Sequence, residues 1–166
     1  MTAPVPVLAQ VTSRAATAAD ETFLFDLYSA VRGPELAHLP LPQGQRSQLM
    51  KMQYTWQTNA YRAAYPESNY EIVILDNEPV GRLWVARSDV RLHLVDIALH
   101  PSFQNRGIGT VLLRRLQTEA CKYRKQIVSS VVRFNTGSLR FHLRLGFRVV
   151  ADDEMTLSLV WNAEQL

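Results

Sequence analysis

Two glycines, Gly107 and Gly109, stand where an apolar strand-like run passes into a helix-like run in RLHLVDIALHPSFQNRGIGTVLLRRL. A helix start exposes unpaired N–H groups and the positive end of the helix dipole, so it attracts anions. Successive N–H groups in such a turn can surround a phosphate, and glycine keeps the inside of the turn free of side chains. Arg106 can add charge-assisted hydrogen bonds from the rim. The pattern therefore predicts a phosphate-binding turn.

The surroundings of the two glycines narrow this prediction. A dinucleotide-binding fingerprint would need a further glycine at Leu112, and a P-loop would need Gly-Lys followed by Ser or Thr. Pro101 ends the preceding strand, an amphipathic helix follows, and a second glycine-containing segment, NTGSLRFHLRLGF, comes later in the chain. These neighbours make the pattern more specific than the glycines alone.

The composition is that of an ordinary globular protein, and we expect residues 1–166 to form a single domain. The only cysteine, Cys121, excludes a disulfide framework and a cysteine-based zinc cage, and we expect no metal. No apolar run is long enough for a membrane span, and MTAPVPVLAQVTSR lacks a secretory signal pattern, so we expect a cytoplasmic protein without a membrane partner. The net charge is only +3 and no nucleic-acid-binding motif is present, so we expect no nucleic-acid partner.

The spacing of apolar residues predicts a mixed α/β chain in the order β-α-α-β-β-β-α-β-α-β-β. Gly33 and Pro34 are expected to break the first helix. The second helix carries apolar residues at helical spacing, and we expect Met52 and Trp56 among them to lie in the core; the set is Leu49, Met52, Trp56, Ala60 and Ala63. The predicted ranges are 9–17, 17–32, 45–64, 70–75, 79–86, 91–99, 107–123, 126–133, 135–147, 147–150 and 155–161.

With both segments in view, DIALHPSFQNRGIGTVLL followed by NTGSLRFHLRLGF resembles the GNAT superfamily of acyl-CoA-dependent N-acyltransferases. The resemblance covers the strand and hairpin order of residues 70–161, whereas the N-terminal half matches only in having a strand and two helices. It implies the GNAT fold, with a central, mostly antiparallel twisted sheet that is split by a V-shaped cleft and flanked by about four helices. It also implies acetyl-CoA as co-substrate.

The resemblance assigns roles to particular residues. The pyrophosphate of coenzyme A would lie on the turn, and a bulge in strand 91–99 would present backbone groups to the pantetheine arm. The Leu99 N–H would bind the acyl oxygen as an oxyanion donor. The cofactor-binding residues implied are Ile97, Ala98, Leu99, Gln104, Asn105, Arg106, Gly107, Ile108, Gly109, Thr110, Asn135 and Phe141.

The proton-transfer groups are less well defined. An ammonium acceptor must lose a proton before it attacks, and Asp96 or His93 could be the base. Asp96 could instead form an ion pair with an arginine of a neighbouring strand such as Arg82. Many GNAT members have a tyrosine that protonates the leaving thiolate where this chain has His142. His142 could serve as that acid, or it could be a structural residue.

The function expected from these residues is N-acetyl transfer from acetyl-CoA directly to a primary amine of a small molecule or protein. The missing tyrosine leaves an alternative, a catalytically weak regulatory domain that binds coenzyme A. The sequence leaves the oligomeric state open; members of the superfamily are often dimeric, and in a homodimer the segment MTLSLVW could contribute to the interface. The acceptor is not identified by any motif.

Overall fold

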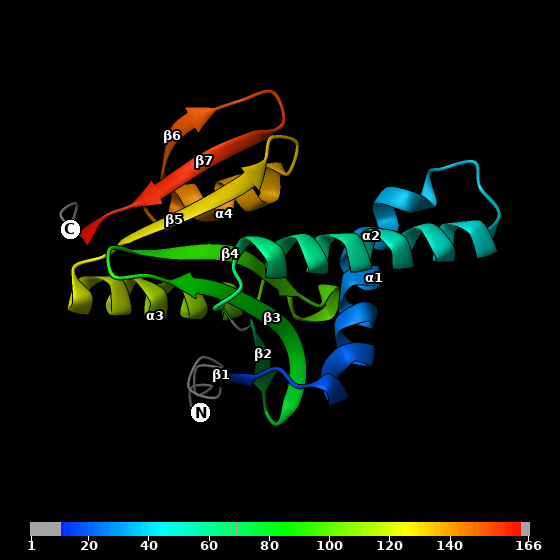
Figure 1. Ribbon diagram of the computed structural model, residues 1–166, viewed down its shortest axis with the longest axis horizontal. Helices are drawn as coiled ribbons and strands as arrows, with labels where there is room; N and C mark the ends of the chain where they lie inside the picture. Colours follow the sequence, from blue (N-terminus) through cyan, green and yellow to red (C-terminus); the bar gives the residue numbers. More distant parts are fainter. Residues whose placement is uncertain (1–10, 69, 164–166) are drawn as a thin grey trace, which may run out of the picture. The chain divides into compact units, whose positions relative to one another are not determined.

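A computed structural model describes residues 11–68 and 70–163 of the chain. The described part is mixed α/β, with a seven-stranded, mostly antiparallel open sheet and four α-helices (Figure 1). Its elements, in chain order, are β1 (Val11–Ala15), the 3-10 helix η2 (Ala18–Asp20), α1 (Glu21–Ala37), α2 (Gln43–Ala64), β2 (Tyr70–Leu75), β3 (Glu78–Arg87), β4 (Arg91–Leu99), the 3-10 helix η3 (Pro101–Phe103), α3 (Ile108–Tyr123), β5 (Gln126–Val132), α4 (Thr136–Arg144), β6 (Arg148–Asp152) and β7 (Thr156–Trp161). The predicted order of helices and strands is therefore confirmed. We expect no signal peptide in residues 1–14, and of these, residues 1–10 lie outside the described residues.

The strands are ordered β1-β2-β3-β4-β5-β7-β6 in the sheet. Internal contacts divide the chain into two compact units. Unit 1 comprises Met1–Trp84 and Asp96–Ile108, and unit 2 comprises Val85–Val95 and Gly109–Leu166. Among the described residues, no helix combines the length and the hydropathy that crossing a membrane requires.

The core of unit 1 forms where α1 and α2 pack on the first strands of the sheet. Leu24, Tyr54 and Ile72 are its buried centre. β2 and β3 form an antiparallel hairpin whose connection is Asp76-Asn77, and both residues have positive φ, 51° and 66°. Short side chains such as Asp and Asn tolerate that conformation and favour two-residue hairpins. The predicted hairpin is confirmed.

The break predicted at Gly33 and Pro34 is wrong, because α1 continues through both to Ala37. Proline removes one backbone hydrogen bond and crowds the preceding turn. Here it stands near the end of the helix, where little helix follows it. The Arg32 guanidinium also bridges this turn, with Nη1 2.9 Å from Oε1 of Glu35. In Figure 1 the end of α1 and the start of α2 project away from the strands of unit 1.

The buried face of α2 also differs from the prediction. Met52 and Trp56 are 62% and 75% exposed, so their expected place in the core is wrong. The buried residues are instead Met50, Tyr54 and Thr58, which are also at helical spacing. Tyr54 decides the orientation, because its ring packs on the aromatic rings of α1 and its hydroxyl donates a 2.9 Å hydrogen bond to Glu21.

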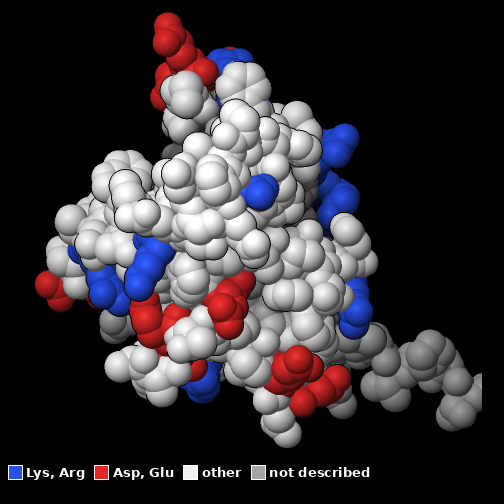
Figure 2. Space-filling model, turned by 90° about the vertical axis from the view of Figure 1, so that its right-hand side faces the viewer, with Lys and Arg blue, Asp and Glu red and all other residues white. Residues whose placement is uncertain are grey.

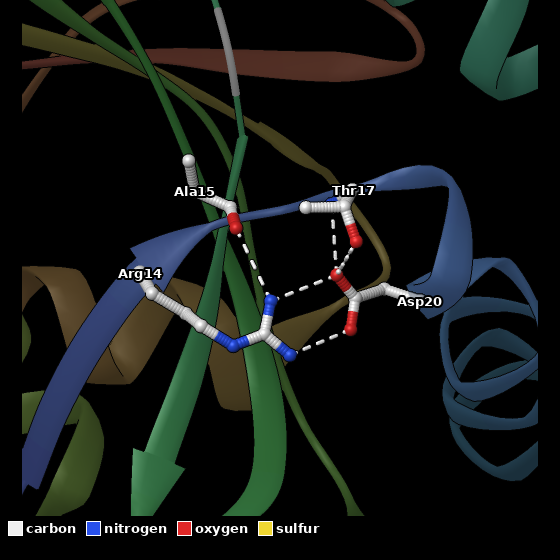
Figure 3. Close-up of polar contacts among 4 residues, drawn as sticks. All are labelled: Arg14, Ala15, Thr17 and Asp20. Atoms are coloured by element: carbon white, nitrogen blue, oxygen red, sulfur yellow. Dashed lines mark hydrogen bonds and ion pairs between the residues drawn. The ribbon is translucent and has the colours of Figure 1, made fainter.

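A polar cluster at the start of η2 and α1 joins β1 to the first helical segment (Figure 3). The Arg14 guanidinium makes two hydrogen bonds, 2.8 and 2.7 Å, to the two carboxylate oxygens of Asp20. The same carboxylate accepts hydrogen bonds from the backbone N–H and the hydroxyl of Thr17, which is the N-cap residue. Hydrogen bonds from Arg14 first, and then from Thr17, hold the pKa of Asp20 well below its usual value.

We expect Asp20→Asn to lower the thermal unfolding midpoint at pH 7 by about 3 °C, the effect of losing one helix-capping interaction in a chain of this size. A carboxylate whose pKa is lowered by folding stabilises the native state above its unfolded pKa, near 3.9. That contribution is lost as the pH falls further. The native chain should therefore lose stability more steeply between about pH 5 and pH 2 than the variant does, which thermal melts across that range would measure. Parallel pH profiles for the two chains would contradict the assignment.

Unit 2 is organised around β5, β7 and β6. β7 lies between the other two and is antiparallel to both, with Ser129 opposite Leu159 and Val149 opposite the same residue. From α3, the buried Gln117 side chain donates a 2.7 Å hydrogen bond to the Leu145 carbonyl, just after α4. In the strand order, β7 lies between β5 and β6, and β6 is at the edge of the sheet.

Candidate functional site

In the turn between η3 and α3, only one of the two glycines has the positive φ that favours glycine. Gly107 has φ 83° and Asn105 has φ 59°, so two residues of this turn are left-handed. Gly109 lies inside α3 and is not among the residues with positive φ. The backbone conformation therefore accounts for a glycine at position 107. At position 109 the advantage of glycine is the space that it leaves at the helix start.

The side chains of the turn have two different partners. Gln104 donates a 2.9 Å hydrogen bond from Nε2 to the Leu99 carbonyl, which ties the turn to the end of β4. The Arg106 guanidinium lies over the ring of Phe103, 5.1 Å from its centroid, and the side chain is exposed. Gln104 thus holds the turn in place, while Arg106 is free to approach an anion at the start of α3.

The end of β4 lies outside the pairing with β5. The parallel register joins residues 91–94 to residues 126–129, with Leu94 opposite Ser129 as its last pair. β4 continues to Leu99, so residues 95–99 lie beyond the last pair of this register. Ile97, Ala98 and Leu99, the residues expected to meet the pantetheine arm, lie in this stretch, although the Ala98 carbonyl oxygen lies against Gly81 of β3. The predicted bulge in β4 stays a prediction.

Asp96 forms an ion pair with Arg82 of β3, as one of the two sequence readings expected. Arg82 Nε and Nη2 lie 2.9 and 2.8 Å from Asp96 Oδ2. The side chains are 5% and 21% exposed, respectively. Burial by itself would lower the pKa of Arg82, but the attraction and hydrogen bond of Asp96 raise it overall. Among the described residues, no donor reaches Asp96 Oδ1, which leaves that oxygen available to another molecule.

The Arg82–Asp96 ion pair lines a hollow in unit 1. The hollow is small, with a cavity volume of about 30 Å³, and it opens to solvent. One wall is apolar and comes from α1, and residues of α1, α2, β3 and β4 complete the lining: Leu24, Leu27, Tyr28, Val31, Arg32, Gln57, Arg82, Asp96 and Ala98. Burial raises the pKa of Tyr28, so its hydroxyl is protonated and can donate at neutral pH. A hollow of this size has room for the ammonium group of an amine beside the carboxylate, while the rest of the amine would extend toward solvent.

His93, the alternative base, lies in unit 2. It is half-buried in β4 opposite Val128 of β5. Burial, and then the positive charge of Arg91, lower the pKa of His93. The ring is therefore mainly neutral at pH 7, as a base must be, but it does not line the hollow that holds Asp96.

α4 begins and ends as the second glycine-containing segment predicts. The Asn135 side chain caps the helix by accepting a 3.0 Å hydrogen bond from the Ser138 N–H. Gly146, with φ 86°, follows the helix, and its N–H donates to the Leu143 carbonyl. Phe141 is half-buried, and the Arg144 guanidinium lies 5.8 Å from its ring centroid. Asn135 and Phe141 both belong to unit 2, and their roles at a cofactor stay predictions.

His142, the candidate acid, is buried in unit 2 at 2% exposure. Its Nδ1 lies 2.8 Å from the Ser138 carbonyl oxygen, and its ring contacts Phe141 and Phe147 edge to face. A carbonyl only accepts, so Nδ1 carries the proton, and Nε2 has no hydrogen-bond partner among the described residues. Burial lowers the pKa of His142. This geometry favours a neutral structural histidine over a proton donor.

We expect His142 to make the native state lose stability below about pH 6.5, its unfolded pKa. The unfolded chain binds the proton there and the folded chain does not, so acid favours unfolding by roughly 1 kcal/mol per pH unit in this window. His142→Leu removes the titrating group. Urea unfolding at pH 7.5 and 5.5 should therefore show a smaller stability loss for the variant than for the native chain. Equal losses would mean that His142 titrates normally.

Several residues that line the hollow are not predicted from the sequence. Tyr28, Arg32 and Gln57 come from the two helices, where no motif marks them. A helical wheel places Leu24, Leu27 and Val31 on one face, but it does not show which polar neighbours of that face line a cavity. Among the described residues, no three His, Cys, Asp or Glu side chains are grouped so that they could hold a metal ion.

Comparison with known proteins agrees with this geometry. A model of the acetyltransferase (GNAT) family matches residues 34–147, which is more than half of the chain. The match includes the hollow's Arg82 and Asp96, the turn, and all of α4. No curated protein is significantly similar to the chain in sequence.

Solved structures share the fold at low sequence identity. PaiA N-acetyltransferase from Thermoplasma acidophilum, in complex with coenzyme A, is 14% identical over 92% of this chain and 98% of its own, with a TM-score of 0.68. An acetyltransferase from Thermus thermophilus is 19% identical over 92% and 97%, with a TM-score of 0.67. A GNAT family acetyltransferase from Elizabethkingia anophelis with acetyl-CoA bound is 17% identical over 92% and 98%, with a TM-score of 0.54.

Proposed function

Because the chain belongs to the GNAT family of acetyltransferases, we propose that it transfers an acetyl group from acetyl-CoA directly to a primary amine. The observation that carries this proposal is the turn before α3. Its left-handed residues Asn105 and Gly107 lead directly into a 16-residue helix whose second residue is Gly109. Such a turn presents backbone N–H groups to a pyrophosphate, and the exposed Arg106 adds positive charge.

The donor is proposed to follow β4 from this turn. Residues 95–99 lie outside the β5 pairing, so their backbone can bond the amide groups of a pantetheine arm. Leu99 N–H would then bind the thioester oxygen and stabilise the negative charge that develops there on attack. Two similar structures were determined with coenzyme A or acetyl-CoA bound, which supports this donor.

The acceptor is proposed to enter the hollow of unit 1. Asp96 Oδ1 would accept a hydrogen bond from the ammonium group and take a proton from it, directly or through water. Arg82 holds the carboxylate through Oδ2, which fixes the direction of Oδ1. On the face of the molecule in Figure 2, acidic and basic side chains are interspersed rather than gathered by sign. This distribution gives no reason to prefer a polyanionic acceptor.

One observation favours a second candidate, a regulatory domain that binds coenzyme A with little turnover. The chain lacks the tyrosine that resemblance to the family leads one to expect, and the histidine in its place is buried with Nδ1 bonded to a carbonyl. A departing thiolate would then take its proton from water or stay charged. Binding and turnover must therefore be measured separately.

Calorimetric titration with acetyl-CoA and coenzyme A tests the donor site, and we expect saturable binding of both below millimolar concentration. A panel of small amines, aminoglycosides, amino acids and peptides with free N-termini, with thiol detection, then tests transfer. Acceptor-dependent thiol release supports the acetyltransferase. Binding without any release supports the regulatory domain, and no binding at millimolar ligand rules out both.

A further inference from the structure

Gly81 of β3 makes an unusually close approach to the end of β4 within unit 1. A Cβ atom added at Gly81 would lie 2.4 Å from the Ala98 carbonyl oxygen and 3.3 Å from Leu99 Cα. It would also lie 2.6 Å from Leu99 Cδ2. Cβ atoms in proteins essentially never come within 3.0 Å of such neighbours, so any other residue at position 81 must change the spacing between the backbones of β3 and β4.

A bulge in β3 accompanies this approach. Val73 of β2 pairs with Gly81, whereas the next residue, Ile74, pairs with Pro79, so Val80 is the extra residue. The Val80 carbonyl accepts a 2.9 Å hydrogen bond from the His100 N–H, at the end of β4. Bulges redirect a strand locally and often lie beside functional sites. Here the bulge turns β3 toward residues 98–100.

The same short segment has a third restraint from the other side. The Leu99 carbonyl accepts the 2.9 Å hydrogen bond from Gln104 Nε2 in the turn. Residues 98–100 are thus held by hydrogen bonds to the Val80 carbonyl and the Gln104 side chain. The absence of a side chain at Gly81 leaves the space that this segment occupies. We refer to Val80, Gly81 and Gln104 as the β4 clamp.

We propose that Gly81 is a positioning residue for acetyl transfer, and that the β4 clamp aims the Leu99 N–H at the thioester oxygen. This inference rests on the proposed function, in which Leu99 is the oxyanion donor. Such a donor is effective only about 2.7–3.1 Å from the oxygen that it stabilises. Relieving the contact of a Cβ with the Ala98 oxygen from 2.4 to 3.0 Å requires a shift of about 0.6 Å, which exceeds that range. Gly81 does not have positive φ, so its backbone conformation does not require glycine. Glycine is needed at this position only because there is no space for a Cβ atom.

The test compares the native chain with Gly81→Ala, using acetyl-CoA and coenzyme A as probes. In the native chain we expect acetyl-CoA to shift the ¹⁵N–¹H resonance of Leu99 and coenzyme A, which lacks the acyl oxygen, to shift it much less. In Gly81→Ala this difference should disappear, while both ligands still shift the resonances of Arg106 and Gly107. Turnover with the best amine of the panel should fall about 100-fold at little change in the KM for acetyl-CoA.

Two further variants keep the inference falsifiable. Gly44→Ala is the matched control, because a Cβ there meets nothing within 4 Å, and it should behave like the native chain. His100→Pro suits the φ of His100, −55°, but it removes the hydrogen bond to Val80 and places the proline Cδ against the Val80 carbonyl, so it displaces residues 98–100 without any change at Gly81. It should lose the Leu99 response in the same way, even if Gly81→Ala does not fold.

The double variant Gly81→Ala/Leu99→Ala separates backbone displacement from side-chain crowding. It removes the contact with Leu99 Cδ2 but keeps the contact with the Ala98 oxygen, so we expect no recovery. Recovery of native turnover would overturn the inference, as would a native Leu99 response in Gly81→Ala and His100→Pro. If the native chain itself binds neither acetyl-CoA nor coenzyme A, the proposed function fails instead.

Discussion

Replacing Gly109 by valine is expected to weaken coenzyme A binding about 100-fold while leaving the fold intact. Hydrogen bonds to a charged group contribute about 1.5–3 kcal/mol each, and losing two of them costs at least two powers of ten in affinity. Valine and glycine differ little in helix propensity, and Gly109 does not have positive φ, so the helix itself tolerates the change. Calorimetry with coenzyme A measures the affinity, and urea unfolding measures the stability.

Gly44 supplies the matched control for this experiment. It is the second residue of α2, as Gly109 is the second residue of α3, and a Cβ at Gly44 meets nothing within 4 Å. Gly44→Val should therefore bind coenzyme A like the native chain. Gly109→Ala should fall between the native chain and the valine variant, because alanine adds a single methyl group where valine adds a branched side chain. Unchanged affinity in Gly109→Val would place the pyrophosphate elsewhere.

Removing the carboxylate of Asp96 is expected to cause the largest loss of stability, about 3 kcal/mol for Asp96→Ala. The change leaves the guanidinium of Arg82, 5% exposed, without its counter-charge. An uncompensated buried charge costs more than the ion pair contributed, because the desolvation of the remaining partner is no longer offset. Urea unfolding at pH 7 measures the difference in the free energy of unfolding.

A double variant and an exposed ion pair act as controls. Arg82→Met/Asp96→Leu replaces both charges by apolar groups and should be less destabilised than Asp96→Ala alone. Arg32 lines the same hollow but is 34% exposed in its pair with Glu35, so Arg32→Gln should change stability by less than about 1 kcal/mol. A small effect in Asp96→Ala would show that water reaches Arg82 and solvates it.

A third variant, Asp96→Asn, distinguishes the two roles of Asp96, as a catalytic base or as a structural partner of Arg82. Asp96→Asn keeps the size of the side chain and can still accept a hydrogen bond from Arg82, but it cannot take a proton. If Asp96 is the base, turnover should fall by about 100-fold or more in this variant while acetyl-CoA binding is retained. If the carboxylate only holds Arg82, stability should fall and turnover per folded molecule should stay near the native value.

The secondary structure was predictable because local signals and tertiary structure agree over most of the chain. β4 runs over residues 91–99 as its apolar pattern predicts, and Gly146 ends α4 with positive φ. The exceptions have identifiable causes. Helix α1 passes Pro34 because the residue lies near the helix end, and α2 buries Tyr54 rather than Trp56 because the aromatic rings of α1 accept the tyrosine.

The residues proposed for the donor side of the candidate site could be named from the sequence for a similar reason. The glycines, Gln104 and Arg106 are close in sequence, so their spacing alone brings them into one turn, and the family match supports the reading. The acceptor side combines residues from α1, α2, β3 and β4. No spacing along the chain relates Gln57 to Asp96, because only the packing of the helices on the sheet brings them to one hollow.

The sequence by itself therefore determined the order of elements, the family and the turn before α3, all of which depend on contacts between near neighbours in the chain. The tertiary structure alone decided which partner Asp96 has, that His142 is buried, and that Gly81 must lack a side chain. Each of these depends on an atom of another element within a few ångströms. Such distances are set by how strands and helices pack, and a one-dimensional pattern does not contain them.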